Sequence, residues 1–511
     1  MDKWKKNSSR TKVCKIKTST ILSLSLLLFV FFLTYYSLPT SRSTNSAAII
    51  AGELPQCTAR YKYRPDSLKW LPKDEKYMWF APHSGFSNQV SEFKNALLIA
   101  GILNRTLIIP PIMDHHAVAL GSCPKFRVKP AHELRSAVWD HINSLMKKSR
   151  YVSMADIIDL SGLISSSLVK VIDLRIFVSL WCGLDIRSSC SGSLCHSLAE
   201  TIQAWGSYKK CGELLSGLIR NTPHCVYGVE EDCRTTVWTY QEEFDNTMDS
   251  FQPDDSLRMK KKINYSRKRR NIDKALGHGS KADHATVLLF GTLFTAPYKG
   301  SELYIDIHKG PKDERIGSLL EKTEFLLFAP EILNAGKEYA RERIKEPFLC
   351  AQLRMLDGQF KNHWQTTFSA LKDKLKNVQN QFQGKHKAVD IFLMTDLPES
   401  NWTGTYLGDL AADSRSYKLH VLNEKDDFVV NTSRKFITRE YGFRSGVSQH
   451  FLKRLSTNGK YSPRVLPDIL LYIEETICSC ASVGFVGTVG STIADNIEQM
   501  RKHNVCSLSL G

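Results

Sequence analysis

Near its carboxyl end the chain reads, from residue 481 to residue 497, Ala-Ser-Val-Gly-Phe-Val-Gly-Thr-Val-Gly-Ser-Thr-Ile-Ala-Asp-Asn-Ile. The apolar run Val483–Val486 predicts a short buried strand. Three glycines let the backbone turn tightly, and Ser491 and Thr492 suit the start of a helix over Ile493–His503. A helix that begins at such a turn points N–H groups and its positive dipole end outward. The stretch therefore predicts either a phosphate site or an ordinary strand–helix junction.

The rest of the globular sequence repeats this alternation in two successive sets. The first set has strands at 78–81, 106–109, 169–172 and 286–290 and a helix at 90–103. A helix over 330–344 precedes the second set, which has strands at 348–353 and 389–394 and helices at 363–378 and 466–480. This order predicts an α/β protein with two domains that face a cleft.

The amino terminus differs from the remainder of the 511-residue chain. The first twenty residues hold seven basic residues and Asp2, and the uncharged run Ile21–Leu38 follows and ends at Pro39. Eighteen residues are close to the lower limit for a membrane-spanning helix. A cleaved signal peptide is the alternative, with Ser46-Ala-Ala48 as a weak cleavage site. The basic flank predicts a cytoplasmic tail and a luminal bulk, as in a single-pass type II membrane protein.

Cysteine usage agrees with a luminal location. Twelve of the 13 cysteines follow the apolar run. A group within about fifty residues predicts a disulfide-stapled insertion, because this spacing lacks the paired C-x-x-C elements of a zinc site. The group comprises Cys182, Cys190, Cys195, Cys211, Cys225 and Cys233. Glycosylation sequons begin at Asn104, Asn264, Asn401 and Asn431.

The net charge of +17 is concentrated in two places. One is the amino-terminal tail, and the other is Arg258–Arg270, which holds two basic clusters. Such clusters occur in nuclear-localisation signals and nucleic-acid patches. We expect a basic surface loop instead, because the segment would be luminal, and nucleic acid is not an expected partner.

Polar residues follow three of the predicted strands. The first is the turn Gly85-Phe-Ser-Asn-Gln89. The second is Gln352-Leu-Arg354, where Gln352 lies near the end of its strand and Arg354 just after it, and the third is the pair Thr395-Asp396. Ligands of open α/β sheets lie at the carboxyl ends of strands. An arginine there can form a bidentate pair with a pyrophosphate, whereas a surface arginine paired with Asp357 is the alternative. Asp114-His115-His116 lacks matching carboxylates, and the chain has neither a D-x-D motif nor an EF-hand loop, so no metal site is expected.

Taken together, these motifs resemble the GDP-fucose protein O-fucosyltransferase superfamily, especially its large plant branch. Gly85–Gln89 with Leu103–Pro111 is similar to the first-domain signature, and Phe348–Arg354 is similar to the strand that carries the essential arginine. Ile391–Asp396 and residues 481–497 look like the remaining donor-binding elements.

The resemblance implies a GT-B-like fold, that is, two Rossmann-like domains, and an inverting transfer of fucose from GDP-fucose to a hydroxyl of a protein or glycan. It implies no cofactor and no metal. Arg354 would be the catalytic residue that holds the β-phosphate, and Ser491, Thr492 and Asp396 would bind the donor nucleotide. Gly85, Phe86, Asn88 and Gln89 would shape the wall near the sugar and the acceptor.

The expected organisation is a single-pass Golgi glycoprotein with a luminal catalytic region. Its parts are a cytoplasmic tail (1–20), a signal-anchor (21–38), a stem (39–75), an N-terminal Rossmann-like domain with the cysteine-rich insertion (76–345) and a C-terminal nucleotide-sugar domain (346–511).

Three positions depart from the family pattern. Gln352 stands where members often have His, Ile493 replaces an aromatic residue, and Ser84 replaces the glutamate base of some members. These departures keep a second hypothesis open. The chain would then be a non-catalytic regulatory or binding protein with this fold, and its basic run would suit the nuclear envelope.

Overall fold

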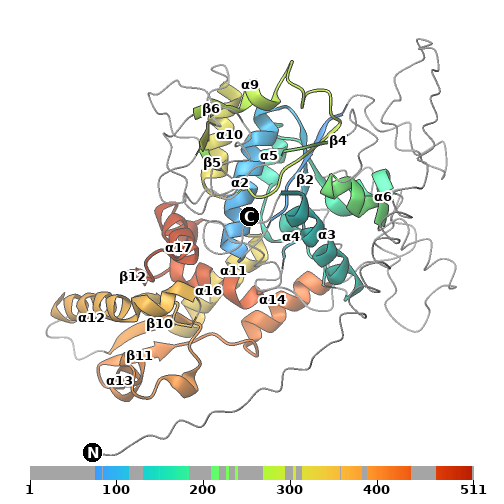
Figure 1. The fold of residues 1–511 in the computed structure, drawn as a ribbon. Coiled ribbons are helices and arrows are strands. Elements are labelled where there is room, and N and C mark those ends of the chain that lie inside the picture. The colour runs from blue at the N-terminus through green and yellow to red at the C-terminus, as the bar shows by residue number, and fades with distance from the viewer. Residues whose placement is uncertain are drawn as a thin grey trace, which may run out of the picture. The chain divides into compact units, whose positions relative to one another are not determined.

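The computed structural model describes residues 75–82, 85–113, 131–148, 150–182, 209–217, 226–229, 236–239, 269–293, 303–306, 314–356, 358–381, 388–438 and 468–508 (Figure 1). The predicted tail, signal-anchor and nearly all of the stem lie outside these ranges. Within them, no helix combines the length and the apolarity that a bilayer crossing requires.

The first sheet has five parallel strands in the order β3-β2-β1-β7-β4. The strands are β1 (Tyr77–Trp79), β2 (Thr106–Ile109), β3 (Val171–Asp173), β4 (Val226–Gly228) and β7 (Val287–Leu289). Helix α2 (Phe86–Ile102) leads from β1 to β2, because parallel neighbours need a crossover connection. All three residues of β1 are buried, as expected for a central strand that is covered on both faces.

The second sheet has four parallel strands in the order β11-β10-β9-β12. They are β9 (Phe348–Leu353), β10 (Val389–Thr395), β11 (Tyr417–His420) and β12 (Gly484–Gly487). Residues of β9 alternate between two cores. Leu349, Ala351 and Leu353 belong to one apolar cluster, and Phe348 and Cys350 belong to another that also includes the first sheet.

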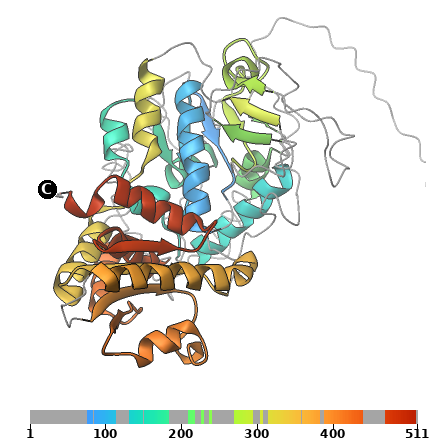
Figure 2. The same cartoon turned by 90° about the vertical axis from the view of Figure 1, so that its left-hand side faces the viewer.

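Helices α12 (Trp364–Gln381) and α17 (Thr492–Lys502) lie on opposite sides of this second sheet (Figure 2). Two glycines of β12 allow them to approach closely. A Cβ at Gly484 would meet Lys374 of α12 at 2.5 Å, and a Cβ at Gly487 would meet Ala494 of α17 at 2.5 Å.

A third sheet of three parallel strands has the order β5-β8-β6. Its strands are β5 (Thr236–Thr239), β6 (Arg269–Asn271) and β8 (Leu303–Asp306). The sequence predicted a basic loop where β6 lies. That prediction was wrong for Arg269 and Arg270, which pair with β8.

The other helical segments connect and cover these sheets. They are α3 (Ala131–Lys147), α4 (Met154–Ile157), α5 (Ser161–Ser165), α6 (Leu174–Cys182), α9 (Ile272–Leu276), α10 (Glu314–Glu324), α11 (Pro330–Tyr339), α13 (Tyr406–Ala412), α14 (Asp427–Thr438), α16 (Ile469–Ser479), the π-helix η3 (Ala340–Ile344) and the 3-10 segments η4 (Gly358–His363), η5 (Glu399–Asn401) and η6 (Val505–Ser507). By its contacts, Cys57–Gly511 forms one compact unit, so the division at residue 345 stays a prediction.

Disulfides tie several elements together. Cys182 pairs with Cys211, which confirms a disulfide within the predicted cysteine-rich group. The other four members of that group lie outside the described residues. Two further bridges involve α16 and its end. Cys350 of β9 pairs with Cys478, and Cys480 pairs with Cys506.

Candidate functional site

The carboxyl ends of β9, β10 and β12 form one edge of the second sheet. Leu353 pairs with Thr395 of β10, and Gln352 pairs with Gly487 of β12. Three motifs therefore meet here, as the strand pattern predicted, and the first and the last of them are more than 130 residues apart in the sequence. They contribute Arg354, Asp396 and the turn that precedes α17.

Arg354 is the first residue after β9 and is half-buried. Its backbone N–H donates to Oγ1 of Thr488 at 2.9 Å. Its guanidinium carbon lies 4.9 Å from the ring centroid of Phe360, a distance at which the ring face attracts the cation. The backbone and the side chain of Arg354 are thus both held by neighbouring residues.

Asp396 organises the loop that follows Arg354. One carboxylate oxygen accepts from the backbone N–H of Met355 at 2.6 Å, and the other accepts from that of Leu356 at 3.1 Å. Both oxygens of the predicted nucleotide contact are therefore already engaged with the protein. The structure gives Asp396 the role of a loop anchor beside Arg354.

The turn from β12 to α17 has its apex in solvent. The backbone N–H of Ser491 donates to the carbonyl of Thr488 at 3.1 Å, and Gly490 has a φ of +74°, where an L side chain would be strained. Val489 at the apex is 63% exposed. The turn therefore carries the chain into α17 while its tip stays accessible.

Ser491 and Thr492 differ in what they can contact. Ser491 is the N-cap residue of α17 by position, but its side chain makes no capping hydrogen bond and it is fully buried. Thr492 is half-buried and opens the helix. The first N–H groups of a helix have no partner within it, so the start of α17 offers donors for an anion. A direct side-chain contact with a ligand is open to Thr492 and not to Ser491.

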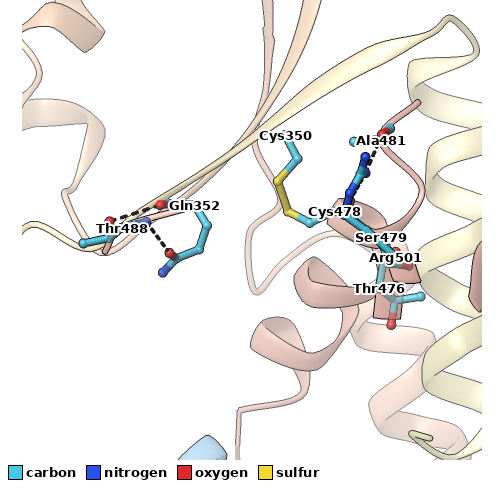
Figure 3. The surroundings of a disulfide bond; sticks show 8 residues. All are labelled: Cys350, Gln352, Thr476, Cys478, Ser479, Ala481, Thr488 and Arg501. Carbon is cyan, nitrogen blue, oxygen red and sulfur yellow. Dashed lines mark hydrogen bonds between the residues drawn. A yellow bond between two sulfur atoms is a disulfide. The ribbon is translucent and has the colours of Figure 1, made fainter. Parts of the chain in front are cut away.

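Gln352 is a residue that the sequence placed beside Arg354 without giving it a role. Its Oε1 accepts from the backbone N–H of Thr488 at 3.1 Å (Figure 3). Its Nε2 donates to Oγ of Ser491 at 3.4 Å. The available signal was a lone amide in an otherwise apolar strand. A buried polar group of this kind must find hydrogen-bond partners, and here they lie in the turn before α17.

The first-domain turn is built mainly by internal contacts. Gly85 is the N-cap residue of α2, and Phe86 is buried with its ring 4.4 Å from that of Tyr472 in α16. Gln89 is fully buried, and its amide exchanges two hydrogen bonds with the backbone of Met113, at 2.9 Å and 3.0 Å. Phe86 thus packs against α16 and Gln89 anchors the loop at Met113, and their predicted part in shaping a substrate site stays a prediction.

Asn88 is the one polar side chain of this predicted set that keeps an unused atom. The residue is half-buried, and among the described residues its Oδ1 has no hydrogen-bond partner. A buried acceptor without a partner is costly, so a ligand or water that donates to it would lower the free energy. His83 and Ser84, which precede this turn, lie outside the described residues, as does Asp357.

The described sequon residues are all exposed. Asn104 lies in the turn after α2 with a φ of 49°, Asn401 lies in η5, and Asn431 lies within α14. Asn264 and Asp114–His116 lie outside the described ranges. Among the residues that the structure does describe, no three His, Cys, Asp or Glu side chains are grouped to hold a metal ion. Metal independence stays a prediction.

The chain is similar to one protein family and to a named plant protein. The family model described as GDP-fucose protein O-fucosyltransferase matches residues 77–385. The chain is 54% identical over 484 residues to O-fucosyltransferase 30 of Arabidopsis thaliana, which covers 94% of this chain and 92% of that protein.

Solved structures of POFUT1 were also found. The complex with GDP is 13% identical and the complex with GDP-fucose 14% identical, each with a TM-score of 0.36. Each alignment covers 84% of this chain, and 96% and 95% of the two POFUT1 chains respectively.

Proposed function

The chain belongs to the GDP-fucose protein O-fucosyltransferase family, and on that premise we propose that it transfers fucose from GDP-fucose to a hydroxyl of a protein or glycan. The observation that carries this proposal is the sheet edge where Arg354 and the start of α17 meet through Thr488. A guanidinium and a helix amino terminus are two groups that bind phosphate well, and the backbone of the residue that carries the guanidinium is joined through Thr488 to the turn before α17.

In the proposed reaction the acceptor oxygen attacks the anomeric carbon of fucose. The bond from that carbon to the β-phosphate oxygen breaks, and GDP leaves with the bonding electrons. Arg354 and the backbone N–H groups that begin α17 face the charge that develops on the β-phosphate, and such preorganised donors stabilise the transition state. The acceptor proton passes to a base or to water.

The other predicted residues support this contact set. Thr492 would touch the pyrophosphate, whereas Ser491 and Asp396 hold the loops in place. Asn88, with its unused acceptor, would face the sugar or the acceptor hydroxyl, and Gly85, Phe86 and Gln89 would fix the backbone around it. We further propose a GT-B-like arrangement with a cleft, an inverting course and no metal.

We also propose a single-pass type II orientation in the Golgi membrane, with residues after the anchor in the lumen. The basic tail before the run Ile21–Leu38 supports this orientation. The three disulfides support an oxidising compartment.

The test is donor binding and turnover by the full-length protein with a panel of nucleotide sugars. We expect GDP-fucose to be bound and turned over, and Arg354→Ala to lower kcat about 100- to 1,000-fold. The control is Arg341→Ala, because Arg341 is exposed and, within the part of the chain that the structure describes, its ion pair is with the adjacent Glu342 at 3.0 Å. A wild type that binds GDP-fucose without turnover would favour the binding-protein hypothesis. An unchanged Arg354→Ala variant would refute the site.

A further inference from the structure

A buried polar network lies beneath the proposed phosphate site. Gln352 is 2% exposed, Thr488 is 1% exposed and Ser491 is fully buried. Gln352 is the only polar residue of β9, whose other five residues are apolar and buried. An amide at such a position costs free energy unless its hydrogen bonds are made, so the partners of Gln352 matter.

The N–H and the hydroxyl of Thr488 form hydrogen bonds with Gln352 and with the backbone of Arg354. Its backbone N–H donates to the carbonyl of Gln352 at 3.0 Å and to Oε1 of the same residue at 3.1 Å. Its hydroxyl donates to the Gln352 carbonyl at 3.1 Å and accepts from the N–H of Arg354 at 2.9 Å. One hydroxyl thus both donates and accepts a hydrogen bond at the ends of two strands. Figure 3 shows its contact with Gln352.

These bonds extend the pairing of β9 and β12 beyond their last ladder pair. The ladder ends at Gly487 and Gln352, and Arg354 lies two residues further along. Without the Thr488 hydroxyl, the N–H of Arg354 would lose the one acceptor that joins it to β12. The Gln352 side chain then reaches Ser491, the residue just before α17.

We propose that Thr488 and Gln352 are positioning residues that lock the backbone of Arg354 to the start of α17, so that the guanidinium and the helix amino terminus bind the diphosphate as one unit. This inference rests on the proposed function. Neither residue would contact the donor. Both act by fixing the separation of two groups that do, and a displacement of about 1 Å in such a site is enough to lower rates strongly.

The test uses the full-length protein with GDP as the probe. Thr488→Val keeps the shape of the side chain and removes its hydroxyl, whereas Thr488→Ser keeps the hydroxyl. We expect Thr488→Val to raise the Kd for GDP about tenfold or more and to lower kcat, and Thr488→Ser to stay within about threefold of wild type. Binding is measured by calorimetry, and turnover by GDP release.

A double-mutant cycle separates positioning from general stability. In an Arg354→Ala background, Thr488→Val should change the Kd for GDP less than twofold, because its effect acts through Arg354. The matched control is Thr323→Val in α10, where a buried hydroxyl donates to the Leu319 carbonyl at 2.8 Å. Thr323→Val should lower the melting temperature and leave GDP binding unchanged.

Gln352→Met is the second variant if Thr488→Val does not fold. It removes the side-chain hydrogen bonds of Gln352 to Thr488 and Ser491. The bonds of Thr488 to the Gln352 carbonyl and to the Arg354 N–H remain, so we expect a three- to tenfold weaker binding of GDP. The inference is overturned if the variants lower only the melting temperature, or if Thr488→Val and Arg354→Ala act additively. It would then fail alone if Arg354→Ala still weakens GDP binding, whereas a wild type that binds no GDP would defeat the proposed function as well.

Discussion

At the scale of single residues, the most unusual group outside the site is Glu475 of α16. It is fully buried; one oxygen accepts from Asn496 of α17, and the other has no hydrogen-bond partner among the residues that the structure describes. Burial raises the pKa of Glu475 to about 8, although the hydrogen bond from Asn496 acts in the opposite direction. Burial also raises the pKa of the neighbouring Glu474. Glu475 is therefore protonated in the folded protein at neutral pH.

This protonation makes folding stability depend on pH. Above the ordinary carboxyl pKa of 4.5, the unfolded chain releases the proton while the folded chain keeps it up to pH about 8. The free energy of unfolding must therefore fall as pH rises across that window. Between pH 6 and pH 7.5 we expect the free energy of unfolding to fall by about 2 kcal/mol more in the wild type than in Glu475→Gln, which carries no titrating proton at this position.

The measurement is urea unfolding of both proteins at several pH values in that range. The control is Glu424→Gln, because Glu424 is exposed and its replacement should leave the pH dependence unchanged. Equal slopes for the wild type and Glu475→Gln would show that the buried carboxyl does not hold its proton.

The sequence predicted the positions of the residues at the sheet edge better than it predicted their contacts. Arg354 and Asp396 were placed correctly because each follows a strand with a clear apolar pattern. That Asp396, Ser491 and Gln89 satisfy backbone or side-chain groups of the protein could not be predicted, since those partners are far away in the chain. Gln89 binds Met113, and Gln352 binds Thr488, 136 residues away.

At the scale of elements, the approach of α17 to β12 depends on Gly487. A Cβ there would meet the Cβ of Ala494 at 2.5 Å and the ring of Phe485 at 3.0 Å. Gly487→Ala should therefore push α17 away from the strand. We expect a loss of about 1–3 kcal/mol in the free energy of unfolding and weaker binding of GDP.

Denaturant unfolding and GDP calorimetry test this together. Gly317→Ala in α10 is the control, because a Cβ at Gly317 meets nothing within 4 Å. That change should stabilise its helix by about 0.5–1 kcal/mol and leave binding as it was. A Gly487→Ala protein with unaltered stability would mean that β12 and α17 are less tightly packed than described.

Elements with strong periodicity were predicted within a few residues. Strands 106–109 and 348–353 agree with β2 and β9, and the predicted helix 493–503 agrees with α17. The order of strands in each sheet was not predicted, because neighbours such as β9 and β12 are chosen by tertiary packing. The short strand β11 was missed, since none of its four residues is fully buried and its apolar pattern is weak.

At the scale of the whole molecule, one disulfide spans a large part of the chain. Cys350 and Cys478 are 128 residues apart and join β9, which leads to Arg354, with α16, which packs against α17. A cross-link of this span restricts the unfolded chain strongly. In the chain-entropy model, it stabilises the fold by about 4–5 kcal/mol.

The bridge from Cys480 to Cys506 is a natural comparison, because it closes only 26 residues at the same end of α16. The same model gives it about 1 kcal/mol less stabilisation. We therefore expect the double variant Cys350→Ala/Cys478→Ala to be destabilised more than Cys480→Ala/Cys506→Ala, as measured by denaturant unfolding without reductant. The wild type in reductant should be less stable than either double variant without reductant, because all three described bridges are then lost.

Peptide mapping under thiol-blocking conditions connects this prediction to the proposed orientation. A luminal protein should yield Cys350 and Cys478 in one linked pair of peptides, because disulfides persist in the secretory pathway and are rare in the cytosol. Blocked free thiols at both positions in protein taken directly from cells would contradict both the bridge and the luminal placement. If the linked pair is found but the two double variants are equally destabilised, the luminal location stands. The dependence of disulfide stabilisation on loop length is then refuted.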